Sequence, residues 1–229
     1  MTASAPLTLE IVCATHLSAE DFWRCTALGQ SLAFNRPERR IVTRLACGGT
    51  QTLAQIGNQA IDDTGTASGI LVFLHDDLWL QDWDFVNRIA EGLAHHDLIG
   101  LAGCTRRFPG QLAWFQVPPT ERHTLSGIVA QGSEPATGVI SAFGPVPQAC
   151  ELLDGMLLAA RKSTLVQHGL RFDPGLDLHF AGVDLCRSAR QRGLRLGTWP
   201  LSVTHQGLGH VNPVDEATAR QRYLARWPD

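Results

Sequence analysis

The sequence predicts an α/β fold with a mostly parallel central sheet flanked by helices. Apolar segments of strand length alternate with helical patterns through the first hundred residues, an order that builds parallel sheets. Hydrophobic residues make up 44% of the 229 positions, so the chain can bury a sizeable core. We therefore expect a single domain over residues 1–229, with about residues 1–7 frayed at the amino terminus.

The first half of the chain contains the clearest elements. Ser18 has the side chain of a helix N-cap, with Asp21 three residues later, and Gly48-Gly49 turns the chain into the next helix. Strands are expected at residues 9–14, 40–46, 69–74 and 98–102, and helices at residues 18–28, 52–61 and 83–93.

The second half begins with an irregular region over about residues 104–148. Pro-Gly and Pro-Pro pairs and single glycines separate short apolar stretches there, a pattern compatible with hairpins. Long connections inside compact domains often carry function, so we expect this region to form part of an acceptor-side wall. Regular elements follow: strand 151–160 with Asp154 as its one central carboxylate, helix 183–192, strand 194–199 and helix 214–227.

Composition excludes several functional classes. The net charge of -3 creates no overall cationic field, so neither nucleic acid nor an anionic membrane surface is an expected partner. No apolar run is long enough to span a bilayer and the first residues lack the features of a signal peptide, so we expect a cytoplasmic protein. The six cysteines are dispersed and are expected to be reduced thiols. No Gly-x-Gly-x-x-Gly or Walker loop follows a strand, which disfavours dinucleotide and P-loop sites.

A triplet of metal-binding residue types, His75-Asp76-Asp77, follows the expected strand 69–74. Ligands of open α/β sheets bind outside the carboxyl ends of the strands. Two carboxylates and an imidazole can hold Mg²⁺ or Mn²⁺ there, and the ion would neutralise the charge of a diphosphate leaving group. The alternative is that Asp76 or Asp77 only caps the following turn through an Asx hydrogen bond.

Short motifs in a shared order carry a family resemblance. The segment Val72-Phe73-Leu74-His75-Asp76-Asp77-Leu78 resembles the strand and metal motif of family-2-like inverting glycosyltransferases, in particular a bacterial subgroup with a His-x-Asp version of the Asp-x-Asp motif. Further matches, spread over about residues 9–210, are Asn58-Gln59-Ala60-Ile61, Leu153-Asp154-Gly155, Arg171-Phe172-Asp173, His179-Phe180, Val183-Asp184-Leu185-Cys186 and Val203-Thr204-His205. The resemblance implies a GT-A-type fold and transfer of a sugar from a nucleotide-diphosphate sugar with inversion.

The resemblance also implies roles for individual residues. His75, Asp77 and His205 are the implied metal ligands, and Mn²⁺ or Mg²⁺ is the implied cofactor. Asp184 is the implied catalytic base, which removes the proton of the acceptor hydroxyl. The implied nucleotide- or substrate-binding residues are Asn58, Asp76 and Asp154.

Each of these residues also has an explanation without chemistry. Asp184 lies in the first turn of an expected helix, where a carboxylate is stabilising by itself. Asp154 competes with Asp184 for the role of base, and it can instead pair with a backbone amide or with Arg161. Asn58 can be a polar residue on a helix face, and the spacing from His205 to the next histidine fits no standard zinc pattern.

Two departures from the family pattern restrict the expected function. Val183 replaces the acidic residue that usually precedes the base, and the Gln-x-x-Arg-Trp motif of processive members is missing, so one transfer per encounter is expected. The expected partners are a UDP-sugar donor and a glycan or other hydroxyl acceptor, in polysaccharide biosynthesis. A metal-dependent phosphoesterase or nucleotidyltransferase and a noncatalytic nucleotide- or sugar-binding module are the alternative functions.

Overall fold

The computed structural model describes residues 7–34, 38–65, 69–176, 179–207 and 213–228, with the side chains of residues 179 and 213–216 excepted. The frayed terminus that we expected lies outside the described residues for positions 1–6. Leu7 is described and packs against the core. No helix of the described ranges has the length and hydropathy that crossing a membrane requires.

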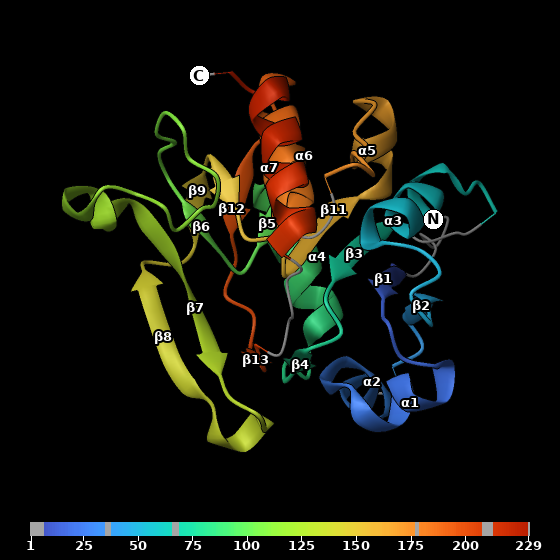
Figure 1. Ribbon diagram of the computed structural model, residues 1–229. Helices are drawn as coiled ribbons and strands as arrows, with labels where there is room; N and C mark the ends of the chain where they lie inside the picture. The colour runs from blue at the N-terminus through green and yellow to red at the C-terminus, as the bar shows by residue number, and fades with distance from the viewer. Residues whose placement is uncertain (1–6, 35–37, 66–68, 177–178, 208–212, 229) are drawn as a thin grey trace, which may run out of the picture.

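A seven-stranded mixed sheet forms the centre of the molecule (Figure 1). Its strands, in spatial order, are β2 (Ile41–Ala46), β1 (Leu9–Ala14), β3 (Ile70–Leu74), β11 (Leu157–Arg161), β5 (Leu98–Gly100), β12 (Leu196–Thr198) and β9 (Gln148–Cys150). Most run in one direction, and only β11 and β9 among these are antiparallel to their neighbours. The expected α/β class is therefore confirmed, with strands at residues 9–14, 40–46 and 69–74 correct to within one residue.

Helices cover both faces of this sheet because alternate strand residues point to opposite sides. Leu71 and Phe73 pack into one core cluster, whereas Ile70, Val72 and Leu74 pack into the other. The first cluster includes side chains of α3 (Leu53–Asp62), α5 (Lys162–Gln167), α6 (His179–Gln191) and α7 (Pro213–Arg226), and the second includes side chains of α1 (Ala19–Cys25), α2 (Ala27–Phe34) and α4 (Phe85–His95). All five residues of β3 are buried, as expected for a central strand covered on both faces.

Side-chain caps explain where two of the helices begin and where one ends. Ser18 accepts a hydrogen bond from the Asp21 amide, which confirms the predicted N-cap of α1. Thr52 forms a capping box with Gln55 at the start of α3. The single helix predicted over residues 18–28 is wrong at its end, because the Thr26 hydroxyl bonds the Phe22 oxygen and α2 begins only after this residue.

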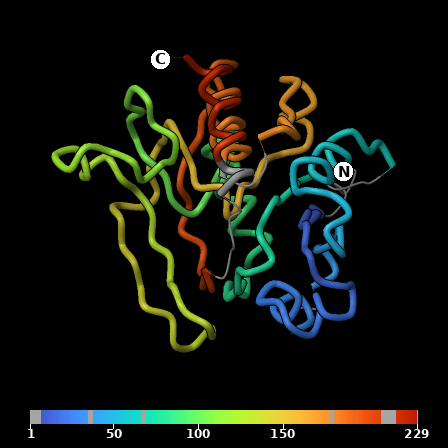
Figure 2. Tube along the Cα trace, viewed as in Figure 1, coloured from blue at the N-terminus to red at the C-terminus, as the bar shows by residue number. Residues whose placement is uncertain are grey.

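A second, six-stranded sheet lies beside the first and was not predicted as a sheet. Its path is β10 (Leu152–Leu153), β6 (Ala102–Cys104), β7 (Leu125–Gln131), β13 (Val203–His205) and β4 (Leu78–Leu80), and β8 (Val139–Gly144) pairs with β7. The long β7–β8 hairpin lies on one side of the trace and the N-terminal strands lie on the other (Figures 1 and 2). The expected hairpin is thus present, and the expectation that residues 104–148 are irregular is wrong for β7 and β8 and for the 3₁₀ turn Pro119–Thr124.

Two predicted strands are each divided between the sheets. The chain leaves the main sheet at Leu101, so the predicted strand 98–102 becomes β5 and β6. The predicted strand 151–160 becomes β10 and β11, with Asp154 in the connection between them. The Asp154 amide donates to the Ala102 oxygen, so the two crossing points lie side by side.

Candidate functional site

The triplet His75-Asp76-Asp77 connects β3 of the main sheet to β4 of the second sheet. Each of its residues forms a backbone hydrogen bond to a different part of the chain, which fixes the path of the triplet. His75 donates to the Met156 oxygen at 3.1 Å, Asp76 accepts from the Leu28 amide at 3.0 Å, and Asp77 accepts from the Gln206 amide at 2.9 Å.

Asp77 and His205 form an ion pair at this junction. Strand β13 pairs with β4 and places His205 opposite Leu78, so that His205 Nε2 lies 3.1 Å from Asp77 Oδ2. Burial opposes ionisation of Asp77, but the hydrogen bond and charge of His205 outweigh it, and the pKa of Asp77 lies below its ordinary value. The hydrogen bond to Asp77 also raises the pKa of His205 above its ordinary value.

One polar atom on each member of this pair has no protein partner. Asp77 Oδ1 and His205 Nδ1 are buried and make no hydrogen bond to the described residues. A buried, unpaired carboxylate oxygen is costly unless another ligand satisfies it. Among the residues that the structure describes, no set of three or more histidine, cysteine, aspartate or glutamate side chains is arranged to hold a metal ion. Asp77 and His205 can therefore each offer one ligand atom to a metal ion, but they do not form a complete metal site by themselves.

Asp76 lies against the end of the neighbouring strand β1. The Thr15 hydroxyl donates to Asp76 Oδ2 at 2.6 Å, and the Thr15 amide is in turn bonded to the Ala46 oxygen at the end of β2. His75 is half-buried, and its charge contributes to the low pKa of Asp77. The three residues of the triplet are thus held in one group by the carboxyl ends of adjacent parallel strands.

Asp154 belongs to the same group. Its Oδ1 accepts from the Met156 amide at 2.6 Å, and its Oδ2 accepts from the indole of Trp114. The Met156 oxygen also accepts the hydrogen bond from the His75 amide. The charge of Asp154 contributes to the raised pKa of His205. The backbone-amide partner that we considered for Asp154 is present, and it fixes the carboxylate beside the triplet.

Comparison with solved structures identifies the fold of this arrangement. The chain is similar to GalNAc-T7, crystallised with UDP, GalNAc and Mn²⁺, with a TM-score of 0.60 and 12% identity over 95% of this chain. It is also similar to TarS of S. aureus, with a TM-score of 0.50 and 12% identity over 96% of this chain. The fold is that of the GT-A glycosyltransferases. The chain spans about half of the GalNAc-T7 chain (48%) and 39% of the TarS chain. No family model and no curated protein matches the sequence.

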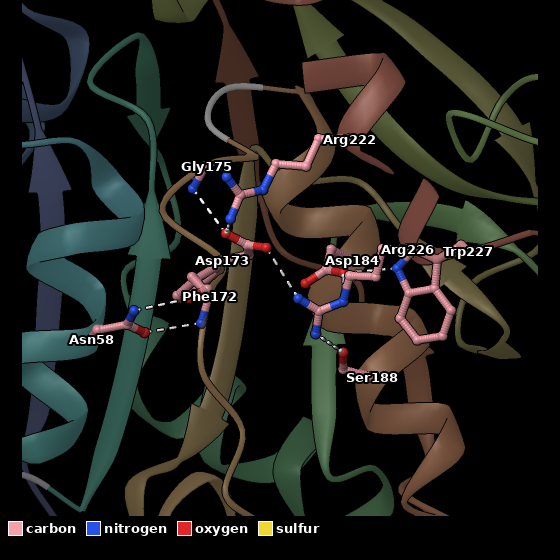
Figure 3. Close-up of polar contacts among 9 residues, drawn as sticks. All are labelled: Asn58, Phe172, Asp173, Gly175, Asp184, Ser188, Arg222, Arg226 and Trp227. Carbon is pink, nitrogen blue, oxygen red and sulfur yellow. Dashed lines mark hydrogen bonds and ion pairs between the residues drawn. The ribbon is translucent and has the colours of Figure 1, made fainter. Parts of the chain in front are cut away.

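Asp184, the predicted base, lies in α6 and contacts α7 (Figure 3). Its side chain has no exposed surface. Oδ1 accepts from the Trp227 indole at 2.7 Å and lies 3.0 Å from Arg226 Nε, while Oδ2 has no protein partner among the described residues. Burial raises the pKa of Asp184, against the hydrogen bond from Trp227 and the charge of Arg226.

The face of α6 that meets the Asp154 connection does not include Asp184. A Cβ placed on Gly182 would lie 2.9 Å from the Gly155 Cα, so α6 contacts this connection through Gly182. Cys186, one turn later, lies against the Leu153 oxygen. Residues two apart on a helix point in nearly opposite directions, so Asp184 faces away from the group around Asp77. Its role as base stays a prediction.

Asn58, the predicted nucleotide contact, is bonded to the segment before α6 (Figure 3). Its Nδ2 donates to the Phe172 oxygen and its Oδ1 accepts from the Phe172 amide, both at 2.9 Å. Both ends of the amide are therefore used within the protein, on the α3 side of the main sheet. A nucleotide contact of Asn58 stays a prediction.

Two residues of this group, Thr15 and Trp114, were not predicted from the sequence. Thr15 follows β1 directly, and its position at the carboxyl end of a strand was the signal that could have identified it. Trp114 comes from the region that we expected to be irregular, and nothing in its local sequence pairs it with Asp154.

Proposed function

We propose that this chain transfers a sugar from a nucleotide-diphosphate sugar to a hydroxyl acceptor with inversion, with Mn²⁺ or Mg²⁺ bound at Asp77 and His205. The observation that carries the proposal is the Asp77–His205 pair. Asp77 Oδ1 has no protein partner among the described residues, and His205 Nε2 lies 3.1 Å from Asp77 Oδ2. The fold supports it, because GalNAc-T7 shares the fold and was crystallised with UDP, GalNAc and Mn²⁺.

The donor set fits an ion that is completed by its substrate. Mg²⁺ is commonly bound by one or two carboxylates together with waters and substrate phosphates, rather than by a full protein cage. Asp77 keeps an oxygen without a protein partner for this purpose, and His205 can become a ligand once Nε2 has lost its proton to solvent. When bound, the ion would neutralise charge on the departing diphosphate. His75 as a further ligand stays a prediction.

The other residues of the group would position the substrates. Thr15 holds Asp76 at the end of β1. We propose that Asp76 contacts the ribose of the donor there. Trp114 and the Met156 amide orient Asp154, which we propose lines the substrate pocket. Two carboxylates remain candidates for the base. Asp154 lies in the connection beside the triplet, but both of its oxygens are bonded, to the Met156 amide and to the Trp114 indole. Asp184 keeps Oδ2 without a partner among the described residues, but it faces away from the triplet.

The finer assignments follow from the family resemblance. We propose a UDP-sugar as donor, and a glycan or other hydroxyl compound of polysaccharide biosynthesis as acceptor. The missing Gln-x-x-Arg-Trp motif favours a single transfer per encounter. We retain the cytoplasm as the proposed location.

A thermal-shift titration tests the proposal, because a ligand that binds the native state raises the melting temperature. The protein is titrated with uridine, guanosine and thymidine diphosphates, each with and without Mn²⁺. The expected result is an Mn²⁺-dependent shift that is largest for uridine diphosphate and is lost in Asp77→Ala. Glu91→Ala, which removes a half-exposed carboxylate of α4, is the matched control and should behave as the wild type.

Three outcomes would count against the proposal. Absence of a shift with all three nucleotides would remove its basis. Release of phosphate or transfer of a nucleotidyl group in the absence of a sugar acceptor would favour the phosphoesterase or nucleotidyltransferase alternative. Binding without turnover would favour a noncatalytic module.

A further inference from the structure

A pocket of about 380 Å³ lies outside the group around Asp77. It is formed where the end of α2, the edge strand β4, the loop that follows β4 and the turn between β7 and β8 meet. Its volume is within the range of roughly 300–1,000 Å³ that is typical of small-ligand pockets. Its aromatic lining residues are Phe34, Trp79 and Trp83, and its polar ones are Gln30, Ser31, Gln81 and Asp82.

Two of the three aromatic side chains of this pocket are largely exposed. Trp83 has 82% and Phe34 has 69% of its surface accessible, and the two rings meet edge to face with centroids 5.5 Å apart. Contiguous exposed apolar surface that is rimmed by polar residues is typical of interaction sites and ligand-binding grooves. The pair thus offers a rigid apolar platform at the rim of the pocket.

The polar walls are held in place by bonds to the protein. Gln81 donates to the Pro135 oxygen at 2.9 Å and accepts from the Thr204 hydroxyl at 2.7 Å. Asp82 Oδ2 accepts from the Ser202 amide at 2.9 Å. The pocket therefore combines polar walls of amide and carboxylate groups with an aromatic pair at its rim.

The charge of the lining restricts the ligand. The lining residues that the structure describes include one carboxylate and no lysine or arginine, so a phosphate or a nucleotide would find no counter-charge. A neutral saccharide matches better, because it presents apolar C–H faces to aromatic rings and hydroxyl groups to amides and carboxylates. We propose that this pocket binds a neutral oligosaccharide.

The position of the pocket separates it from the group around Asp77. In the β4–β13 pair, Leu78 lies opposite His205 and Trp79 lies opposite Thr204, so His205 and Trp79 lie on opposite faces. Asp77 directly precedes β4, the strand that contains Trp79, so the pocket lies near the group around Asp77. A saccharide in the pocket would therefore lie near the group around Asp77 without occupying the proposed metal site at Asp77 and His205. Identifying this saccharide as part of the acceptor rests on the proposed function, whereas its binding does not.

Saturation-transfer NMR tests the binding directly. The protein is mixed with cellotetraose, maltotetraose or N-acetylchitotetraose, in the absence of nucleotide and metal. At least one saccharide should show saturation transfer from the protein. Trp83→Ala should weaken the affinity of the protein for that saccharide on the order of tenfold or more. Phe115→Ala removes an exposed aromatic side chain outside the pocket and is the matched control. Asp77→Ala should bind the saccharide like the wild type, which separates this proposal from the proposed function.

Three results would overturn the inference. Saturation of none of the three saccharides would exclude the ligand class. An equal loss of affinity in Trp83→Ala and Phe115→Ala would place binding elsewhere. A dimer in light scattering that Trp83→Ala converts to a monomer would make the aromatic platform an interface between copies of this chain.

Discussion

Two regions of the molecule contain carboxylates with little exposed surface, and the contacts of these carboxylates differ. At the end of β3, Asp77 is bonded to one histidine and keeps one oxygen without a protein partner among the described residues. In the loop before α6, Asp173 is bonded to both Arg222 and Arg226 of α7 (Figure 3). A carboxylate saturated by arginines holds helices together, whereas a carboxylate left with an open lone pair is available to a ligand.

Asp184 shares one feature with each region. Like Asp77, it keeps one oxygen, Oδ2, without a partner among the described residues, and like Asp173 it is bonded to side chains of the α6–α7 interface. Its contacts with Trp227 and Arg226 belong to the same α6–α7 interface, where Arg187 also lies over the rings of Tyr223 and Trp227. Because Asp184 faces away from the group around Asp77, we expect ligand binding at the strand end and a stabilising role for Asp184 at the helix interface. The predictions below test that assignment in order of expected effect.

The largest effect is expected on nucleotide affinity, for a substitution at the strand end after β3. Asp77→Ala should weaken Mn²⁺-dependent binding of uridine diphosphate on the order of 100-fold or more. Isothermal titration calorimetry measures this change. Asp184→Ala, compared as folded protein, should retain the wild-type affinity. Equal losses in both variants would end the distinction between the two regions.

The next effect is expected for the stability of the helix interface. Asp184→Ala leaves the buried Trp227 indole without its acceptor, so the free energy of unfolding should fall by about 1–3 kcal/mol. Urea denaturation followed by circular dichroism measures it. If transfer is lost while stability is unchanged, Asp184 is the base that the sequence predicted.

Asn58→Ala should lower stability by no more than Asp184→Ala does. The variant loses two hydrogen bonds to the Phe172 backbone, each worth about 0.5–1.5 kcal/mol. Its melting temperature should fall, and its affinity for uridine diphosphate should not change. A selective loss of nucleotide affinity would instead support the nucleotide contact predicted from the sequence.

The smallest effect is expected for Asp173→Asn and depends on pH. Burial opposes ionisation of Asp173, but the Gly175 amide, Arg222 and Arg226 outweigh it, so its pKa lies below the ordinary value of 3.8. A carboxylate with a lowered pKa in the folded state stabilises the protein above the ordinary value, and this stabilisation is lost as pH falls through the lowered pKa.

The wild type should therefore be more stable than Asp173→Asn at pH 7, by less than about 1 kcal/mol because both arginines are largely exposed. Denaturation of both proteins at neutral pH and below pH 3.8 measures the difference, which should shrink in acid. A difference that grows on acidification would contradict the lowered pKa.

The main sheet could be predicted from sequence because its strands are strongly patterned. Ile70–Leu74 is a fully buried apolar run, and Leu9–Ala14 has nearly the same character. The second sheet could not be predicted in this way. Its strands β4, β6 and β13 have three residues each, which is too short to show a period of two. Val139 and Ile140 of β8 are both exposed, so that strand does not alternate either.

The site was predictable only in part for a related reason. His75, Asp76 and Asp77 are adjacent in sequence and follow an evident strand, so their position was clear. Asp154 was expected inside a strand, but it lies at the crossing between the two sheets, which sequence patterning does not reveal. The partner of Asp184 comes from a different helix, and no local pattern indicates whether a carboxylate at a helix start faces a site or another helix.

Hydrogen exchange should show the junction at the end of β3 as one unit. The amides of Leu28, His75 and Gln206 are far apart in sequence, yet all three form hydrogen bonds at this junction. The Leu28 and Gln206 amides donate to the Asp76 and Asp77 oxygens, and the His75 amide donates to the Met156 oxygen. Exchange of any one of them requires the junction to open, so the three amides should share a common exchange rate. A nucleotide bound there would slow all three together, and this protection would report occupancy before any sugar had been transferred.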